Sequence, residues 1–297
     1  MQPGLHLLHK PVGATSFQLV RAAVAELRES GQGKVPVGHG GTLDPFAEGL
    51  LLLLVGQATR LMELIHPLPK TYEAELAWGV ETDTCDLHGL PVGPPQPVDL
   101  DPDRLEAALG PFLGWTGQVP PATSAKKIAG EAAYRKAHRG EVVVLPPSRV
   151  YLHEAAWLRH EAPARSRLRL TCRGGFYVRS LARDLGRVLG CGAHLVTLKR
   201  TAIGPWEDPG PGLRECLSGP ALLPWCRTRR LDDVEADHLA HGRAIALGGI
   251  EPPMWDPPKG FPDPAGPIGA LHGERLVALL KERDGGLSTI ANLRGGL

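Results

Sequence analysis

A rigid loop followed by a buried strand constrains the fold of this chain more than any other feature. The octapeptide Gly38-His39-Gly40-Gly41-Thr42-Leu43-Asp44-Pro45 contains three glycines and ends on a proline. Glycine admits backbone angles that other residues avoid, and proline then fixes its own φ and disfavours helix at Asp44. The apolar run at 50–55 has the length of a buried strand. The sequence therefore predicts a loop that holds one carboxylate against a hydrophobic strand.

Periodic patterns predict several further elements. Thr15 and Ser16 resemble a helix N-terminus, and the apolar spacing after them predicts a helix over 16–29. Alternation over 71–78 predicts a half-buried strand with Tyr72 on its apolar side. Similar patterns predict a helix over 57–65, a helix around 105–112, a strand around 167–171 and a helix over 178–189.

The C-terminal part differs in character from the rest. Residues 251–267 contain seven prolines in seventeen, which excludes regular structure there. The pieces around them resemble short strands between Gly/Pro turns, a pattern typical of a small β-barrel. These pieces are 244–247, 268–271, 276–280 and 287–290. We therefore predict two domains, 1–224 and 225–297.

The charge is balanced over the whole chain but not locally. The formal net charge is +1, which by itself predicts no partner. Residues 121–149 carry six Lys/Arg against two Glu, and residues 159–187 carry eight Arg against one Glu and one Asp. These stretches suggest a surface that binds a polyanion. The alternative is that acidic neighbours in space balance the cations.

Cysteine and histidine usage favours a reducing compartment and no metal. The five cysteines form no CxxC pair, and the N-terminus lacks a signal-peptide pattern, so we expect a cytoplasmic protein. No stretch reaches the ~18 apolar residues that span a bilayer. His238 and His241 form an HxxH without a second ligand pair, so a surface or capping role is the expected one.

Several separated segments together resemble one family, the bacterial tRNA pseudouridine-55 synthases of the TruB type. The matching stretches, in family order, are 10–17, 38–45, 70–72, 82–86, 118–121, 124–127, 172–179, 184–186 and 192–195. Each is a weak pattern, but their occurrence in this order is specific. The resemblance implies an α+β fold with a mixed, largely antiparallel central sheet flanked by helices. It also implies a C-terminal β module similar to PUA RNA-binding domains.

The resemblance implies isomerisation of a uridine in the T-loop of tRNA to pseudouridine. The target nucleotide is flipped out, its N1–C1′ bond breaks, the base rotates and rejoins through C5, and the C5 proton leaves. The reaction involves no redox change or group transfer, so we expect neither cofactor nor metal. The protein must supply a carboxylate, a base and a pocket that retains the detached uracil.

Three residues match the catalytic set of the family. Asp44 matches the catalytic carboxylate, which either attacks the sugar or base or stabilises charge there. Arg179 matches the arginine that pairs with it, since a cation within ~4–6 Å favours a charged carboxylate. Tyr72 matches the tyrosine that stacks on the flipped base and takes the C5 proton. Taken alone, Arg179 could be a surface helix residue and Tyr72 a core aromatic.

Three further residues match the base-binding pocket. His39 matches a histidine beside the extruded nucleotide, where it fills the space that the base leaves or stacks there. Tyr177 matches a pocket-lining aromatic, and Leu198 matches an apolar pocket wall. Their ordinary interpretations are a loop histidine bonded to backbone for His39 and a core residue for Leu198.

The segment 118–149 matches a thumb-like insertion that closes on the RNA. Proline pairs bound it on both sides, and it is rich in cations, as expected of a mobile binding insertion. Lys126 and Lys127 are predicted to contact phosphates and so to position the stem-loop without reading its sequence. We expect tRNA as the partner, no membrane, no obligate protein partner and a monomer.

The sequence departs from the usual family pattern at three places. Gly40 stands where threonine is usual, which we expect to loosen the loop. Gly174 replaces a lysine, which Arg173 could offset from the neighbouring position. Thr123 replaces an aromatic residue and so removes an expected stacking contact in the insertion.

Two other functions compete with the isomerase. A non-catalytic tRNA-binding or RNA-folding protein would keep the fold and the basic face but would have no need of Asp44 with Arg179 and Tyr72. A glycosidase would use Asp44 and Glu48 as its carboxylate pair. The glycosidase explains neither the basic insertion nor the segment that contains Tyr72.

Overall fold

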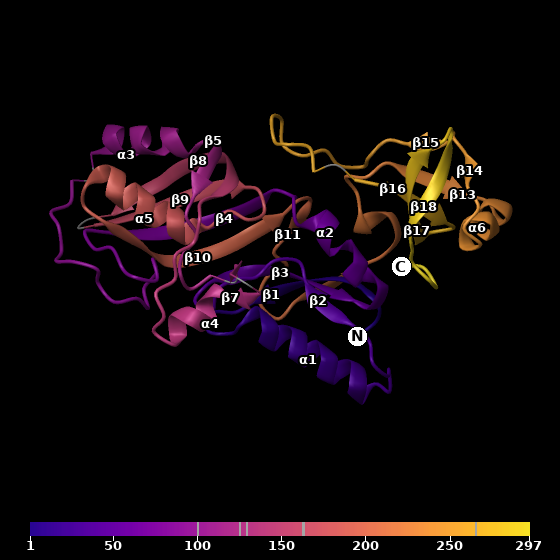
Figure 1. Ribbon diagram of the computed structural model, residues 1–297, viewed down its shortest axis with the longest axis horizontal. Helices are drawn as coiled ribbons and strands as arrows, with labels where there is room; N and C mark the ends of the chain where they lie inside the picture. The colour runs from indigo at the N-terminus through magenta and orange to yellow at the C-terminus, as the bar shows by residue number, and fades with distance from the viewer. Residues whose placement is uncertain (100, 125, 129, 162–163, 265) are drawn as a thin grey trace. The chain divides into compact units, whose positions relative to one another are not determined.

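The computed structural model describes residues 1–99, 101–124, 126–128, 130–161, 164–264 and 266–297 (Figure 1). Ala125, part of one of the matching stretches, lies outside the described residues. The chain forms two compact units by contacts, Met1–Leu68 with Ala202–Leu297 (unit 1) and Pro69–Thr201 (unit 2). The fold is α+β, as predicted. The predicted domain boundary near residue 225 is a different division and stays a prediction.

The central strand of unit 1 is buried on both faces. Residues 50–55 of β3 (Glu48–Val55) are each 0% exposed, so the predicted buried strand is confirmed. Leu52 and Leu54 belong to one core cluster, whereas Leu51 and Leu53 belong to another. The strand therefore needs no polar side, which explains its unbroken apolar run.

The strands β1 (Gly4–Lys10) and β2 (Val37–His39) are antiparallel to β3, and β12 (Arg214–Leu217) is antiparallel to β1. After β3 the chain continues as the 3-10 turn η1 (Gly56–Leu61) and the short helix α2 (Met62–Ile65). The predicted single helix over 57–65 is thus two short pieces, and no side chain caps the start of η1.

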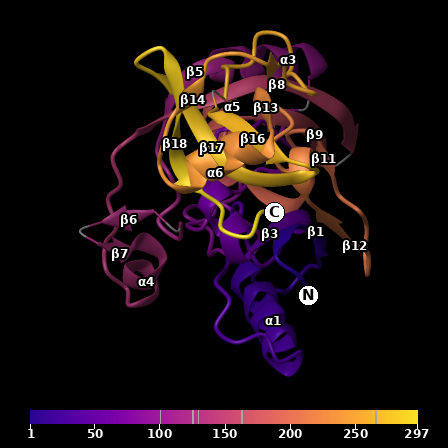
Figure 2. The same ribbon diagram turned by 90° about the vertical axis from the view of Figure 1, so that its right-hand side faces the viewer.

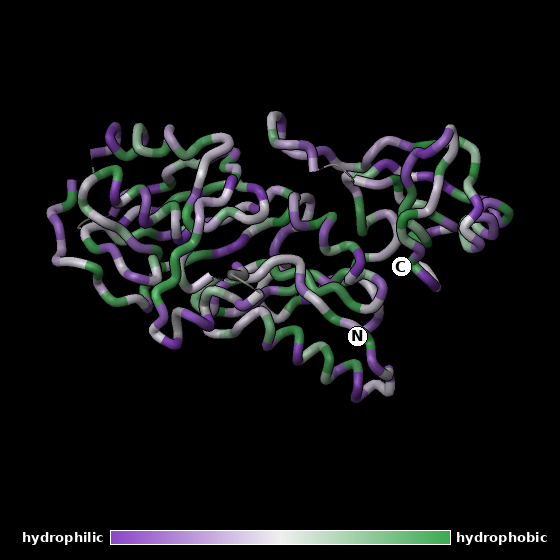
Figure 3. Tube along the Cα trace, in the orientation of Figure 1, coloured by the Kyte–Doolittle hydropathy of each residue, from purple (hydrophilic) through white to green (hydrophobic). Residues whose placement is uncertain are grey.

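The helix α1 (Ser16–Glu29) covers one face of β3. Thr15 forms a capping box with Gln18, which satisfies backbone donors at the helix start. Val20 and Ala23 pack against the β3 cluster. Hydrophobic and hydrophilic residues alternate along this helix (Figure 3), so the predicted amphipathic helix over 16–29 is confirmed.

The C-terminal module of unit 1 is a six-stranded sheet with the order β14-β18-β17-β16-β13-β15. β13 and β16 run parallel, and the other neighbouring pairs are antiparallel. The short strands predicted around 244–290 are confirmed, but β13 and the helix α6 were not predicted. The elements are β13 (Thr228–Leu231), α6 (Asp233–Ala240), β14 (Ile245–Ala246), β15 (Ile250–Glu251), β16 (Ile268–His272), β17 (Arg275–Arg283) and β18 (Gly286–Asn292).

The C-terminal module shares a core with the first strands of the chain. Leu271, Leu276 and Leu279 lie in the same buried cluster as Leu5 and Leu52. The 3-10 turn η3 (Gly219–Leu222) contacts β16 and β17 from within unit 1. Because apolar burial is the main stabilising term in folding, this part of the module is an integral part of unit 1.

Unit 2 is a sheet in the order β10-β4-β9-β8-β5 with two helices packed on it. The predicted strand over 71–78 and the predicted helix over 178–189 are confirmed as β4 and α5. The elements are β4 (Lys70–Trp78), α3 (Pro102–Leu109), η2 (Gly110–Phe112), β5 (Gly114–Gln118), β8 (Ser148–Glu161), β9 (Arg165–Cys172), α5 (Val178–Leu189) and β10 (Ala193–Ile203), whose end pairs with β11 (Trp206–Glu207).

The insertion 118–149 has a small structure of its own. β6 (Lys127–Ile128) pairs with β7 (Glu131–Ala132), and α4 (Ala133–His138) follows directly. Figure 2 shows these three elements as a small group. The predicted proline-bounded segment therefore contains local secondary structure.

Candidate active site

The backbone on both sides of Asp44 is tied to the start of α1 and the end of β1. Ser16 Oγ accepts a hydrogen bond from Leu43 N at 2.9 Å and lies 3.2 Å from Leu43 O, to which it donates. Lys10 Nζ donates to Pro45 O at 3.4 Å. Asp44 itself lies in irregular backbone and is half-buried. The sequence prediction of a fixed, non-helical loop around Asp44 is therefore confirmed.

Lys10 is a buried cation whose ammonium is used to tie loops together. Its side chain is 0% exposed, and Nζ also donates to Ala14 O at 2.7 Å and Pro11 O at 2.9 Å. Gly13 N donates to Pro45 O at 2.7 Å. Burying a charge is costly unless it is hydrogen-bonded, so these carbonyls stabilise Lys10 and Lys10 in turn fixes the loop. The sequence pattern that contains Lys10 did not indicate this role.

Gly40 allows a close approach of the loop to the core. Its N–H donates to Leu52 O at 2.9 Å, and a Cβ at this position would lie 3.2 Å from Leu52 Cβ and 3.4 Å from Ile65 Cγ2. Gly41 has a φ of +131°, which favours glycine. His39, the last residue of β2, faces Leu53 in the strand register and is half-buried. The loop at Gly40 is therefore held against β3 by a hydrogen bond and close packing.

In unit 2 the predicted base Tyr72 lies inside the sheet. It is 7% exposed and opposite Leu170 in the β4–β9 register, which agrees with its interpretation as a core aromatic and leaves its catalytic role a prediction. Lys70 lies two residues earlier, so the two side chains share a face of β4. Desolvation by burial, followed by the charge of Arg200, lowers the pKa of Lys70 to about 7. The sequence pattern that contains Lys70 did not indicate a buried cation.

Arg179 is a buried residue of the first turn of α5. It is 5% exposed, so its alternative interpretation as a surface helix residue is wrong. Its Nη1 donates to Asp86 Oδ2 at 3.3 Å, to Thr84 O at 3.0 Å and to Thr123 Oγ1 at 2.7 Å. Thr123, which replaces an aromatic residue of the family pattern, therefore binds the candidate catalytic arginine.

Asp86 pairs with Arg179, and hydrogen bonds from neighbouring residues fix the Asp86 carboxylate. Its Oδ1 accepts hydrogen bonds from Thr84 Oγ1 at 2.7 Å and from His88 N at 3.0 Å. The Arg179–Asp86 ion pair has side-chain exposures of 5% and 9%. Asp86 was part of a matching stretch, but nothing in the linear sequence showed which cation it would meet. It is a site residue that sequence reasoning missed.

The remaining predicted site residues of unit 2 occupy three different environments. Gln118 holds the backbone of Tyr177 through Nε2 to Tyr177 O at 3.0 Å and Tyr177 N to Oε1 at 2.8 Å. Leu198 is 6% exposed on β10, as expected of a core residue. Lys126 Nζ donates to Ser148 Oγ. Lys127 lies in β6, and the structure describes its backbone alone.

Many cations of the second basic stretch have acidic partners. Glu75 accepts from Arg165 at 2.7 Å and from Arg167 at 3.2 Å. Arg187 pairs with Glu81 at 2.6 Å. For these arginines the alternative interpretation of balanced charges is correct. A polyanion would therefore have to be bound by other cations than these three arginines.

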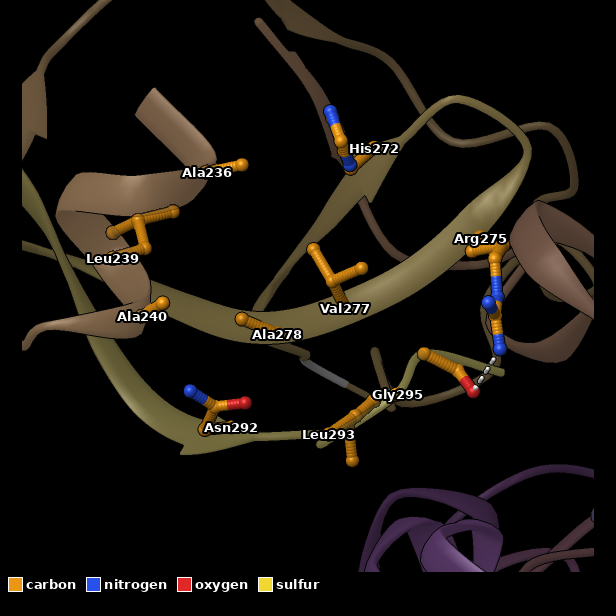
Figure 4. Close-up of a pocket in the computed structure, with 11 residues that line it drawn as sticks. Ala236, Leu239, Ala240, His272, Arg275, Val277, Ala278, Asn292, Leu293 and Gly295 are labelled. Carbon is orange, nitrogen blue, oxygen red and sulfur yellow. Dashed lines mark hydrogen bonds between the residues drawn. The ribbon is translucent and has the colours of Figure 1, made fainter. Parts of the chain in front are cut away.

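A pocket of about 320 Å³ lies in the C-terminal module (Figure 4). It is lined from α6, β17 and β18, and Arg275 at its edge donates to Gly296 O at 3.3 Å. Within the described residues, no group of three or more His, Cys, Asp and Glu could hold a metal ion. None of the helices in those same ranges is both long and apolar enough to cross a membrane.

Two family descriptions match the chain. Residues 30–178 match "TruB family pseudouridylate synthase (N terminal domain)", and residues 179–211 match "tRNA pseudouridylate synthase B C-terminal domain". Three curated relatives bear the name tRNA pseudouridine synthase B. The relative from Rhodopseudomonas palustris is 37% identical over 98% of this chain and 81% of its own length. That from Synechococcus sp. is 41% identical over 82% of this chain and 85% of its own.

The third relative, from Xanthomonas campestris, is 45% identical over 69% of this chain. The alignment spans 65% of that relative, just under two thirds of its length. Among solved structures, a Cbf5-Nop10-Gar1 complex matches with a TM-score of 0.68 at 22% identity, over 98% of this chain and 84% of the matched chain. An H/ACA RNP bound to a substrate RNA matches with a TM-score of 0.67 at 19% identity, over the same shares. At these identities the structures show a shared fold.

Proposed function

The chain belongs to the TruB family of pseudouridylate synthases, and from this premise we propose that it isomerises a uridine of tRNA to pseudouridine. The observation that carries the proposal is the anchored loop of Asp44, held by Ser16 on one side and Lys10 on the other. A loop tied in this way can present one carboxylate with little reorganisation, which is what covalent or electrostatic catalysis requires.

The proposed chemistry uses three side chains. Asp44, ionised, attacks the sugar or base or stabilises the charge that develops as the N1–C1′ bond breaks. A bond forms between C5 and C1′, the proton on C5 is lost to Tyr72, and N1 takes up a proton. Arg179 favours the ionised form of Asp44, and its own position is set by Asp86 and Thr123. The sum of these steps is an isomerisation, so the reaction consumes no co-reactant.

The proposed base pocket combines His39, Tyr177 and Leu198. A plug such as His39 would lower the few kcal/mol that flipping a nucleotide costs. Tyr177 is well suited to line the pocket because Gln118 fixes its backbone from β5. Lys126 and Lys127 of the insertion would contact phosphates.

We further propose that the substrate is the T-arm stem-loop, and that the protein acts as a cytoplasmic monomer. RNA recognition usually targets loops whose bases can be splayed out, and the T-loop is of that type. The C-terminal module, residues 225–297 of the predicted domain division, would contact the acceptor-stem side of the tRNA.

A second candidate is a non-catalytic tRNA-binding or RNA-folding protein of the same fold. It shares the basic insertion but has no use for an anchored carboxylate. The two candidates differ in one measurable respect, because only the isomerase releases the hydrogen at C5.

The test is release of tritium from a T-arm transcript that contains C5-tritiated uridine. We expect release by the wild type and a loss of at least about 10³-fold in Asp44→Asn, which keeps the shape of the side chain. Glu48→Gln is the matched control, since Glu48 is the partner that only a glycosidase would need. Absence of release by the wild type, or undiminished release by Asp44→Asn, would contradict the proposal.

A further inference from the structure

An aromatic and cationic cluster lies on the edge strand of unit 2. β5 is the last strand in the order of this sheet. The guanidinium carbon of Arg149 lies 4.4 Å from the ring centroid of Trp115, and that of Arg173 lies 5.9 Å from it. The rings of Trp115 and Tyr151 are 5.2 Å apart. We call these four residues the Trp115 patch; Trp115 is 43% exposed.

The strand register explains why the patch forms. In the β5–β8 pair, Trp115 lies opposite Tyr151 and Gly117 lies opposite Arg149. Opposite residues and residues two apart share one face of a sheet, so all of these positions face the same way. Because Gly117 has no side chain, Arg149 can lean over the neighbouring indole. Arg173 is brought in from the end of β9 by its N–H, which donates to Tyr151 O at 2.9 Å.

The charges of the patch are not neutralised. Across the described ranges, no carboxylate lies within the 4.0 Å salt-bridge distance of Arg149 or Arg173. This distinguishes them from Arg165 and Arg167, which share Glu75. An arginine that stacks on an indole keeps the N–H groups along its edge available for hydrogen bonds. The patch therefore presents fixed guanidinium groups to an anion.

The patch and Gln118 lie on opposite faces of the same strand, because Trp115 and Gly117 alternate with Thr116 and Gln118. β5 carries Trp115 and ends at Gln118, which holds the backbone of Tyr177 by two hydrogen bonds. Arg173 begins the short loop that leads to Tyr177 and α5. A ligand held at the patch would therefore contact the outer face of the strand whose inner face holds Tyr177 through Gln118.

We propose that the Trp115 patch binds the sugar-phosphate backbone of the RNA substrate outside the pocket that receives the target nucleotide. Arg149 and Arg173 contact phosphates, since guanidinium groups bind phosphate oxygens with fork geometry, and the exposed indole packs against a ribose or base. The charge of the patch is complementary to RNA, and its aromatic surface suits a nucleotide better than an acidic peptide. This inference rests on the proposed function and names a binding surface for it.

The test measures the affinity of the full-length protein for a fluorescein-labelled T-arm transcript by anisotropy over a series of salt concentrations. Each phosphate contact contributes roughly 0.7–0.9 to the slope of log K against log salt. We expect the double variant Arg149→Gln/Arg173→Gln to lose at least about tenfold in affinity and to lower the slope by about 1.5. Trp115→Ala should weaken binding with a smaller change of slope, because it removes the support rather than the charge.

Gly117→Glu provides a variant that keeps every residue of the patch. A Cβ at Gly117 would meet Pro147 at 3.9 Å, an ordinary contact, so the strand can accept the substitution. The new carboxylate would lie opposite Arg149 and pair with it, and we expect the slope to fall by about one. The matched control is Arg165→Gln/Arg167→Gln, which removes two paired cations from the same unit and should leave the slope unchanged.

Two outcomes overturn the inference. One is an unchanged slope and affinity in both the double variant and Gly117→Glu, with folding verified by circular dichroism. The other is an equal loss in the Arg165/Arg167 control, which would indicate general charge rather than a defined surface. The inference fails alone if the wild type releases tritium while the patch variants bind normally. The proposed function fails alone if the wild type binds RNA through the patch and releases no tritium.

Discussion

The backbone around Asp44 in unit 1 and the side chain of Arg179 in unit 2 are held by different kinds of contact. Around Asp44 the anchors are Ser16 and Lys10, which bond to backbone atoms of neighbouring residues. Arg179 is held by a carboxylate and by Thr123. The loop is therefore held through backbone atoms of its residues, whereas the arginine depends on the charge of a carboxylate partner. In unit 1, replacing Asp44 should reduce catalysis with little loss of stability. In unit 2, replacing Asp86 should reduce both catalysis and stability.

The largest effect should come from removing the charge of Asp86, which pairs with Arg179. Asp86→Asn removes a buried countercharge of Arg179, and we expect a loss of about 3 kcal/mol in the free energy of unfolding by urea. Tritium release should fall as well. Asp83→Asn, an exposed carboxylate in the same loop, is the control and should cost less than about 1 kcal/mol. Equal losses in Asp86→Asn and Asp83→Asn would show that the position of Arg179 does not depend on the charge of Asp86.

A pH dependence should mark unit 2 through Lys70. Its pKa is about 7 in the folded protein against a usual 10.5, so between these values the unfolded chain binds more protons and stability rises with pH. From pH 7 to 9 the gain is about 2 kcal/mol, and Lys70→Met should lack it. Burial raises the pKa of Cys172 from 9.0 to about 12, so its opposing effect begins as the unfolded thiol titrates near pH 9 and offsets less than about 0.5 kcal/mol of the gain within that window. Urea unfolding at pH 7, 8 and 9 measures the stability of the wild type and of Lys70→Met. The same rise of stability with pH in the two proteins would contradict the prediction.

The smallest effect tests the anchors of unit 1. Ser16→Ala removes both hydrogen bonds to Leu43, and we expect a loss of about 1–2 kcal/mol in stability together with a lower kcat. Ser30→Ala, at the other end of the same helix, removes one bond to Leu27 and should change little. Asp44→Asn should leave the melting temperature within about 2 °C. A large drop in that variant would show that the loop depends on the carboxylate after all.

The predictions succeeded where local residues decide the structure. The helix over 16–29 and the strand over 71–78 follow from periodicity, which depends on neighbours along the chain. β8 and α6 were not predicted. β8 mixes charged and apolar residues over fourteen positions and is a strand because β5 and β9 pair with it. α6 has one buried residue, Leu239, so its apolar pattern is weak.

The candidate site shows the same division. Asp44 and Tyr72 were placed on the correct kinds of element from the sequence. Asp86 and Gln118 were not assigned roles, because their partners Arg179 and Tyr177 are far away in the chain. The order of residues carries no direct record of such pairs.

The sequence by itself determined the rigid loop of Asp44 and the strand that follows it. Glycine, proline and an unbroken apolar run act on the local backbone, whatever surrounds them. Only the tertiary structure decided which cations are neutralised. Arg167 meets Glu75 across two strands, whereas Arg149 meets the face of Trp115. The physical reason is that ion pairing depends on distances of a few ångströms between residues that the strand pairing, and not the sequence order, brings together.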